Sequence, residues 1–194
     1  QGRLTEQNPE DEPAEALLER IQQEKQRLYE EEEIRKPKTY PPIKPIERRT
    51  ELPDTWCWAR LGDIGTWGAG ATPKRSNPEY WENGSIPWLK TGELNDGYIG
   101  ASEEKTTAKA LQECSLRLNE PGDVLIAMYG ATIGKLSILE VQATTNQACC
   151  ACTPMGGIPS QYLFHLLMSH REAFRQQGAG GAQPNISKTK IVNT

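Results

Sequence analysis

The sequence predicts an α+β domain with a twisted, mixed β-sheet and flanking helices, preceded by one long helix. Runs rich in apolar and β-branched residues at 123–128, 135–139 and 144–152 are typical of buried strands. Apolar side chains recur at helical spacing over 159–177, which predicts a helix there. Residues 14–33 contain good helix formers without Gly or Pro, and they predict the long helix that precedes the domain.

The composition suits one ordinary core with an extended appendage: 194 residues, of which 36% are hydrophobic and 25% charged. The formal net charge of -4 argues mildly against non-specific binding of nucleic acid. Residues 1–52 hold 10 Lys/Arg and 13 Asp/Glu, whereas residues 53–194 hold 12 and 13. The second part is therefore near neutral, and it leaves room for a local basic face.

The sequence lacks an apolar run near the twenty residues of a membrane span, and it lacks the layout of a signal peptide. We therefore expect a cytoplasmic protein without membrane contact. The chain starts at Gln1 and stops at Thr194 without a terminating signal. We expect it to be a piece of a longer protein, truncated at its C-terminus.

The cysteines predict reduced thiols. Their number is odd, and three of them crowd into one expected strand, where adjacent residues point to opposite faces and are poorly placed to pair. The alternative is a zinc site, but the run lacks the CxxC spacing, and the two histidines fall in a helix that is expected to be part of the core. We predict no metal. The residues concerned are Cys57, Cys114, Cys149, Cys150 and Cys152, with His165 and His170.

The long helix expected at 14–33 carries a narrow apolar stripe, which favours packing against a partner helix, as in a coiled coil, over packing in a globular core. The alternative is a solvated, charged helix. The packing residues that we expect are Leu17, Leu18, Ile21 and Leu28. Four prolines in residues 36–49 predict an extended linker that follows the helix, with residues 37–46 reaching roughly 30 Å in polyproline geometry.

The remaining elements follow from local patterns. Gly, Pro, Asn and Ser predict a long loop at 66–87 and a Gly-rich loop at 178–185. The other expected elements are an entering strand and turn at 56–64, a short strand at 86–89, a short helix at 106–114 and the start of a further element at 186–191.

The segment Gly130–Lys135 invites comparison with a phosphate-binding P-loop, and the match fails twice. Tyr129 stands where the first Gly is needed, and Leu136 stands where Ser or Thr should bind magnesium. A strand-turn-strand that uses glycine for its tight geometry is the better interpretation.

Asn77-Pro78-Glu79-Tyr80 is similar to the loop with which amino-methyltransferases hold a flipped adenine. Glu79 departs from that pattern, and the sequence lacks a Gly-rich turn after a strand for S-adenosylmethionine. A turn capped by Asn77 is the better interpretation. A nucleophile with a base and an orienting acid is also missing, so we predict no catalytic residues.

Seven motifs in order resemble a target recognition domain of the type I restriction-modification DNA specificity subunit. The first residues of the chain resemble the central spacer region of the same family. The motifs of the domain are Leu52–Ile64, Gly70–Pro73, Asn77–Trp81, Ile86–Trp88, Ala131–Lys135, Thr145–Gln147 and Gln183–Ser187, and those of the spacer are Gln1–Leu4, Asn8–Ala14 and Leu17–Ile21.

The resemblance implies residues 1–36 as the central spacer region, residues 37–51 as a Pro-rich linker and residues 52–194 as a target recognition domain. It implies a non-catalytic subunit in which paired antiparallel helices hold two such domains apart, each reading one half of a split double-stranded DNA target. Methyltransferase (modification) subunits would supply S-adenosylmethionine and DNA methylation, and a restriction subunit would supply ATP-driven cleavage. This chain would itself hold no cofactor, neither S-adenosylmethionine nor ATP nor Mg²⁺.

The base-reading loops of this family vary between members, so the candidate DNA contacts rest on residue chemistry: Lys and Arg for phosphate or guanine, Asn and Gln for adenine. The alternative interpretation is that these residues lie in ordinary solvated loops. For Lys135 a purely structural role is a further alternative. A protein-interaction scaffold without DNA specificity is the competing function, and a half-size subunit that pairs with a second copy is a further alternative. The candidates are Lys74, Arg75, Ser76, Asn77, Lys90, Thr91, Tyr129, Thr132, Lys135, Gln183, Asn185, Ser187 and Lys188.

Overall fold

The computed structural model describes residues 8, 10–48, 50–179 and 184–194. The chain divides into two compact units. Unit 1 comprises Gln1–Gly65, Met155–Gly157 and Val192–Thr194, and unit 2 comprises Thr66–Pro154 and Ile158–Ile191. The long helix and most of the strands predicted from the sequence therefore belong to different units.

Unit 1 is built on helix α1 (Ala14–Glu30) and the short 3-10 helix η1 (Pro45–Glu47). Helix α1 ends three residues before the predicted end, because Glu32 adopts a left-handed backbone with φ of 59°. Consecutive glutamates at a helix C-terminus oppose the negative end of the helix dipole, which explains the early stop. Ile21 is fully buried on the inner face of α1.

Lys25 is also buried in unit 1, and its Nζ donates to the backbone oxygens of Gly62 and Asp63 at 2.8 Å each. On the same face, a Cβ at Gly156 would lie 2.6 Å from Ile21 Cγ1 and 2.8 Å from Leu17 Cδ1. The inner face of α1 thus packs against its own chain. The predicted contacts of Leu17, Leu18, Ile21 and Leu28 with a partner helix stay a prediction.

Unit 2 contains a five-stranded sheet in the order β1-β8-β5-β6-β3. Strand β5 runs antiparallel to β6 and β8, and β3 runs parallel to β6, so the sheet is mixed as predicted. The strands are β1 (Gly65–Ala69), β3 (Gly97–Ile99), β5 (Val124–Ala127), β6 (Leu136–Leu139) and β8 (Cys149–Pro154).

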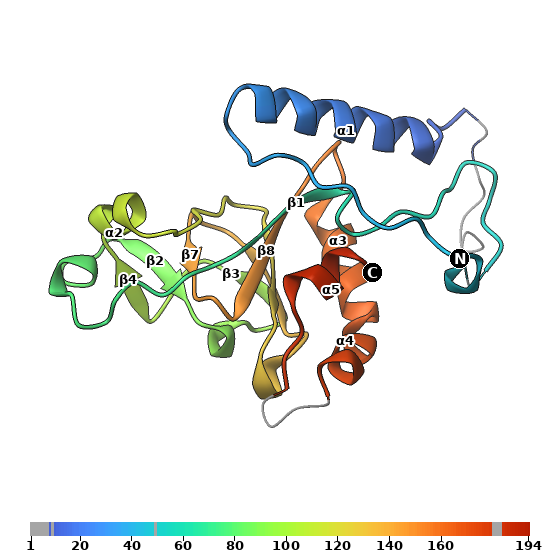
Figure 1. The fold of residues 1–194 in the computed structure, drawn as a ribbon. Helices are drawn as coiled ribbons and strands as arrows, with labels where there is room; N and C mark the ends of the chain where they lie inside the picture. The colour runs from blue at the N-terminus through green and yellow to red at the C-terminus, as the bar shows by residue number, and fades with distance from the viewer. Residues whose placement is uncertain (1–7, 9, 49, 180–183) are drawn as a thin grey trace. The chain divides into compact units, whose positions relative to one another are not determined.

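A second, three-stranded sheet has the order β4-β2-β7, with β2 antiparallel to β4 and parallel to β7. Its strands are β2 (Ile86–Leu89), β4 (Glu104–Thr106) and β7 (Thr144–Thr145). In Figure 1 this sheet lies at one end of unit 2, and α3 and α4 lie beside the larger sheet at the other end. The remaining elements are η2 (Pro78–Tyr80), η3 (Thr91–Glu93), α2 (Ala108–Glu113), η4 (Gly130–Thr132), α3 (Ser160–Ser169), α4 (Arg171–Gly178) and α5 (Lys188–Val192).

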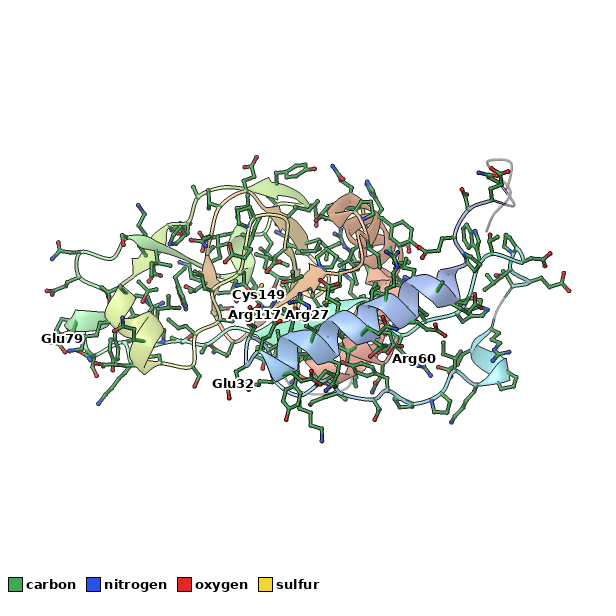
Figure 2. All side chains as sticks on the ribbon, turned by 90° about the horizontal axis from the view of Figure 1, so that it is seen from above. Arg27, Glu32, Arg60, Glu79, Arg117 and Cys149 are labelled. Atoms are coloured by element: carbon green, nitrogen blue, oxygen red, sulfur yellow. The ribbon has the colours of Figure 1, made fainter. Side chains whose placement is uncertain are left out.

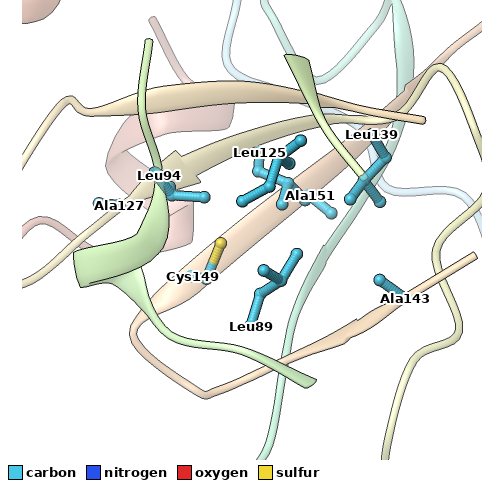
Figure 3. Close-up of a cluster of buried hydrophobic side chains, with 9 residues drawn as sticks. Leu89, Leu94, Leu125, Ala127, Leu139, Ala143, Cys149 and Ala151 are labelled. Carbon is cyan, nitrogen blue, oxygen red and sulfur yellow. The ribbon is translucent and has the colours of Figure 1, made fainter. Parts of the chain in front are cut away.

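The core of unit 2 joins side chains from both sheets (Figure 3). Leu89 of β2 meets Leu125 of β5 and Cys149 of β8 in one buried cluster. The other members are Leu94, Ile99, Ala127, Leu139, Ala143 and Ala151. All five cysteines are free thiols, as predicted. Burial raises the pKa of Cys150 to about 12, so this thiol stays protonated near neutral pH.

The helix predicted over 159–177 is divided into α3 and α4 at His170. Ser169 Oγ donates to the Leu166 oxygen at 2.7 Å, and His170 Nδ1 lies 2.9 Å from the same oxygen. The backbone amide of His170 instead bonds to Leu167 at 3.1 Å, a 3-10 pattern. Side chains that compete for a helix carbonyl bend a helix, which is the physical reason for the break.

The strand predicted within residues 56–64 is wrong, but the turn predicted with it is present at residues 61–63. Strand β1 instead runs from Gly65 to Ala69 and extends into residues 66–87, which the sequence predicts as a loop. The adjacent Gly70 lets the segment after β1 pass close to the backbone of β7. A Cβ at Gly70 would lie 2.1 Å from the backbone oxygen of Thr145. Only glycine permits so close an approach of two backbones.

Within the described residues, the structure contains no helix long and apolar enough to cross a membrane. The same residues contain no group of His, Cys, Asp or Glu side chains that could hold a metal ion.

Candidate nucleic-acid interface

Six of the candidate DNA contacts gather around the three-stranded sheet of unit 2, and we call them the distal group. They are Lys74, Arg75, Ser76, Asn77, Lys90 and Thr91. Asn77 Oδ1 accepts a hydrogen bond from the amide of Glu79 at 3.2 Å and so caps η2. This cap confirms the predicted turn at Asn77 and leaves Lys74, Arg75 and Ser76 exposed in the loop before it.

Arg75 is held by two tryptophans and one glutamate. Its guanidinium carbon lies 4.0 Å from the ring centroid of Trp81 and 4.6 Å from that of Trp88. The two rings form an edge-to-face pair with centroids 5.1 Å apart. Arg75 Nη1 donates to Glu104 Oε2, and Nη2 lies 3.4 Å from Glu104 Oε1. The side chain is half exposed, yet it has a defined position.

The tryptophans are themselves anchored. Trp88 is 2% exposed, and its Nε1 donates to the oxygen of Ala71 at 3.0 Å. Trp81 Nε1 donates to the oxygen of Lys74 at 3.3 Å. The loop that carries Lys74 and Arg75 is therefore tied to the sheet through aromatic side chains.

Acidic residues of the same region pair with three of its positive charges, those of Arg75, Lys90 and Lys109. Lys90 Nζ lies 2.8 Å from Glu103 and 3.1 Å from Glu104, and these hydrogen bonds raise the pKa of Lys90. The hydrogen bond from Arg75 is the main cause that lowers the pKa of Glu104. Lys109 pairs with Glu79 at 2.7 Å. Figure 2 shows Glu79 at the outer end of unit 2, away from Arg117 and Cys149.

A second set of candidates lies at the turn between β5 and β6, and we call it the hairpin group. It comprises Tyr129, Thr132, Lys135, Asn185, Ser187 and Lys188. The Gly130 amide donates to the Pro184 oxygen at 2.9 Å, and the Ile186 amide donates to the Met128 oxygen at 2.8 Å. These bonds bring Tyr129 and Asn185 side by side although they are far apart in the sequence.

The turn itself has the tight geometry predicted for Gly130–Lys135. Gly130 and Gly134 adopt φ of 63° and 80°, the left-handed region that favours glycine. Thr132 Oγ1 donates to the backbone oxygen of Tyr129 at 2.8 Å, and Tyr129 is 44% exposed. Helix η4 occupies the turn between the antiparallel strands β5 and β6, which is the strand-turn-strand predicted for this segment.

Two arginines of α4 hold this turn, and sequence reasoning missed both. Arg171 Nε donates to the Gly134 oxygen at 2.7 Å, and Arg175 Nε donates to the Ile133 oxygen at 3.3 Å. Arg171 also pairs with Asp96, Nη1 to Oδ2 at 3.1 Å. No local pattern marks these arginines, because the carbonyls that they bind come from a distant turn.

The structure uses some of the remaining candidates internally. Ser187 Oγ accepts from the Lys190 amide at 3.2 Å, and Lys188 Nζ lies 3.5 Å from the Trp67 oxygen. Lys135 is half-buried, and Gln183 lies outside the described residues. In Figure 1 the loop of residues 74–77 lies at the far end of the small sheet, whereas the turn of the hairpin group lies next to α4 and α5. The candidates thus form two separate groups.

The chain is similar to known proteins both in sequence and in fold. Residues 53–194 match the family described as "Type I restriction modification DNA specificity domain". The EcoR124I/EcoR124II specificity subunit of Escherichia coli is 30% identical over 141 residues, covering 70% of this chain and 35% of that protein. The MjaIX specificity subunit of Methanocaldococcus jannaschii is 36% identical over 146 residues, covering 73% of this chain and 33% of that protein.

Two solved structures have a similar fold. The HsdS subunit from Thermoanaerobacter tengcongensis aligns with a TM-score of 0.56 at 20% identity, over 93% of this chain and 43% of that one. A chain from a structure of a type I R-M system aligns with a TM-score of 0.58 at 19% identity, over 93% of this chain and 44% of that one. At such low sequence identity, the structural similarity establishes the shared α+β fold alone. The chain spans about a third of the length of the two relatives named above. Because the family match covers most of the sequence, the chain belongs to the type I restriction-modification DNA specificity family.

Proposed function

We propose that this chain supplies one DNA-reading half of a type I specificity subunit. Unit 2 binds one half of a bipartite double-stranded DNA target, through the distal group, the hairpin group or both. Residues 1–36 serve as the spacer, residues 37–51 as the linker and residues 52–194 as the recognition domain. The observation that carries the proposal is the specificity-domain match over residues 53–194, which includes every candidate contact.

The proposed role is recognition without catalysis. Methyltransferase subunits bound to this subunit bring S-adenosylmethionine and methylate the DNA, and a restriction subunit brings ATP-dependent cleavage. This division of labour leaves recognition of the DNA to this chain. It also accounts for a site made of amide, hydroxyl and basic side chains, which can hydrogen-bond to base edges and phosphates.

Unit 1 is proposed to carry the contacts with the other subunits. Its surface exposes Trp56 and Trp58, at 42% and 37%, beside a shallow groove lined by Leu18, Ile43 and Leu52. Exposed apolar side chains around a groove are typical of protein-binding surfaces. Leu18→Asp should reduce co-purification with a modification subunit, whereas Ile46→Asp, 86% exposed outside the groove lining, should not. Equal retention in both variants would contradict this assignment.

Selection of duplexes from a randomised pool by the purified chain tests the DNA-binding role. We expect enrichment of a motif of a few base pairs. Fluorescence anisotropy should then give tighter binding to that motif than to a scrambled duplex, with an affinity that falls as salt rises. Equal affinity for both duplexes would contradict the proposal.

A protein-interaction scaffold without intrinsic DNA specificity is the second candidate function. The neutralisation of Arg75, Lys90 and Lys109 by glutamates favours it, because paired cations attract phosphate weakly. A chain that co-purifies with a modification subunit but enriches no duplex would support the scaffold.

A further inference from the structure

The position of Arg75 is fixed before any ligand arrives. Its guanidinium rests on Trp81 and Trp88 and is bonded to Glu104 on β4. An unrestrained, exposed arginine side chain loses rotamer freedom when it binds a ligand, and this loss of entropy weakens the binding. In this arrangement the folded chain has already lost that freedom, so Arg75 is preorganised for a ligand of matching geometry.

The fork of Arg75 is only partly occupied. A guanidinium has five N–H donors, and Glu104 takes one from Nη1 and is placed to take one from Nη2. Among the described residues, Arg75 Nε has no hydrogen-bond partner. The edge formed by Nε and Nη2 therefore keeps two roughly parallel N–H groups on a side chain that is 50% exposed.

The charges around this edge select the kind of acceptor. Glu104 already balances Arg75, and Lys90 is shared between Glu103 and Glu104. A phosphate at the free edge would meet two carboxylates close by, whose negative charges repel it. A neutral pair of acceptors avoids this repulsion. The O6 and N7 atoms of guanine present such a pair in the major groove, spaced to accept from an arginine fork.

We infer that Arg75 is a specificity-determining residue that reads a guanine through its Nε–Nη2 edge, with Glu104 and Trp81 as positioning residues. This inference rests on the proposed DNA-binding role of unit 2. The inference assigns different ligands to different members of the distal group. Arg75 reads a base, whereas the neighbouring Lys74, which has no ion pair among the described residues, remains available for phosphate.

The decisive variant is Arg75→Lys, which keeps the positive charge but loses the planar fork. The chain and the variant are compared on the motif enriched from randomised duplexes and on every single base-pair change in it. The unsubstituted chain should prefer guanine at one position by about 5- to 150-fold, the range for one bidentate pair. The variant should lose that preference at that position alone, with the other preferences and the salt dependence unchanged.

Glu104→Gln provides an independent variant that keeps Arg75 and both rings. It should weaken the preference at the same position. Lys105→Ala is the matched control, because it removes an exposed charge next to Glu104 on the same strand and should leave every base preference unchanged. Circular dichroism establishes that each variant is folded.

The outcomes separate the inference from the function on which it rests. Failure of the unsubstituted chain to enrich any motif would overturn the proposed DNA-binding role, and the inference with it. An enriched motif without guanine, or a guanine preference that survives Arg75→Lys, would overturn the inference alone. A uniform loss of affinity in Arg75→Lys, or a uniform gain in Glu104→Gln with unchanged base preference, would identify Arg75 as a general charge contact and would also overturn it.

Discussion

Two arginine–glutamate pairs, Arg60–Glu47 in unit 1 and Arg75–Glu104 in unit 2, have the same chemistry in different surroundings. The Arg60 side chain is 9% exposed and that of Arg75 is 50% exposed. Arg60 bonds to Glu47 through both terminal nitrogens and also donates to the backbone oxygens of Pro41, Pro42 and Asn193.

All five donors of Arg60 are therefore used within its own unit, whereas Arg75 keeps a free edge on an exposed side chain. The comparison teaches that an ion pair alone does not distinguish a structural arginine from a binding one. The number of unused donors and their exposure make that distinction. Arg60 also donates to the carbonyls of Pro41 and Pro42, so this part of the Pro-rich linker is held within unit 1 and is not freely extended.

Replacement of each arginine by methionine is the most direct test of this comparison. Arg60→Met should lower the free energy of unfolding by about 3 kcal/mol, because it leaves Glu47 and three carbonyls without their donor. Arg75→Met should lower it by no more than about 1 kcal/mol, the range of an exposed pair. Urea denaturation followed by circular dichroism measures both. Similar losses in the two variants would contradict the structural assignment of Arg60.

Glycine substitutions extend the comparison to the two candidate groups. Gly134→Ala, next to Lys135 of the hairpin group, should cost about 1–2 kcal/mol, because Gly134 has φ of 80° and a Cβ would lie 2.7 Å from Arg171 Cγ. Gly92→Ala in η3, next to Thr91 of the distal group, is the matched control. A Cβ there has no atom within 4 Å, so stability should change by less than about 0.5 kcal/mol. Thermal unfolding of both variants tests the difference.

The acid response of the two glutamates gives a third contrast. The hydrogen bond from Arg60 is the main cause that lowers the pKa of Glu47 from 4.5 to about 2. A carboxyl whose pKa is lowered by folding stabilises the protein above its unfolded pKa, and this stability is lost as the pH falls through the folded pKa. Unit 1 should therefore lose stability between about pH 4.5 and pH 2.

Glu47→Gln should remove most of that pH dependence from unit 1. The pKa of Glu104 is lowered too, mainly by the hydrogen bond from Arg75, so its effect has the same sign. Glu104→Gln should change the acid response less, because the Arg75 pair is more exposed and more screened by solvent. Urea midpoints measured from pH 6 to pH 2 test the order of the two effects, and a larger change in Glu104→Gln would reverse it.

The parts of the fold that the sequence predicted are those with strong local patterns. Strands β2, β5 and β6 are rich in apolar residues, and α1 lacks helix breakers, so each lies close to its expected range. Strands β3 and β4 are three residues long, too short for a period-two pattern. Their strand character comes from pairing with β6 and β2, which no local window contains.

The candidate site was predictable to the same extent. Loop chemistry identified Arg75 and Tyr129, but it could not pair Arg75 with Glu104 or Tyr129 with Asn185, because those contacts depend on how distant segments meet. The hydrogen bond from Arg171 to the Gly134 oxygen was missed for the same reason. Sequence patterns therefore predicted which loop residues carry suitable hydrogen-bonding groups. The tertiary structure decides which of their donors remain free to bind a ligand.

The smallest expected effect concerns Lys74, the neighbour of Arg75. Lys74 is exposed, and its side chain makes no ion pair among the described residues, so it can approach a phosphate without breaking an existing contact. Each phosphate contact releases counterions, and its loss should reduce the slope of log affinity against log salt by about one unit. Lys74→Ala should show this reduction and weaken binding to all duplexes alike.

Arg75→Lys should instead leave the slope of log affinity against log salt unchanged, because the base contact that it removes releases few counterions. Anisotropy titrations at four salt concentrations, with the enriched and the scrambled duplex, distinguish the two residues. An unchanged slope in Lys74→Ala would remove Lys74 from the interface. A reduced slope in Arg75→Lys would mean that Arg75, despite its glutamate, contacts phosphate as well.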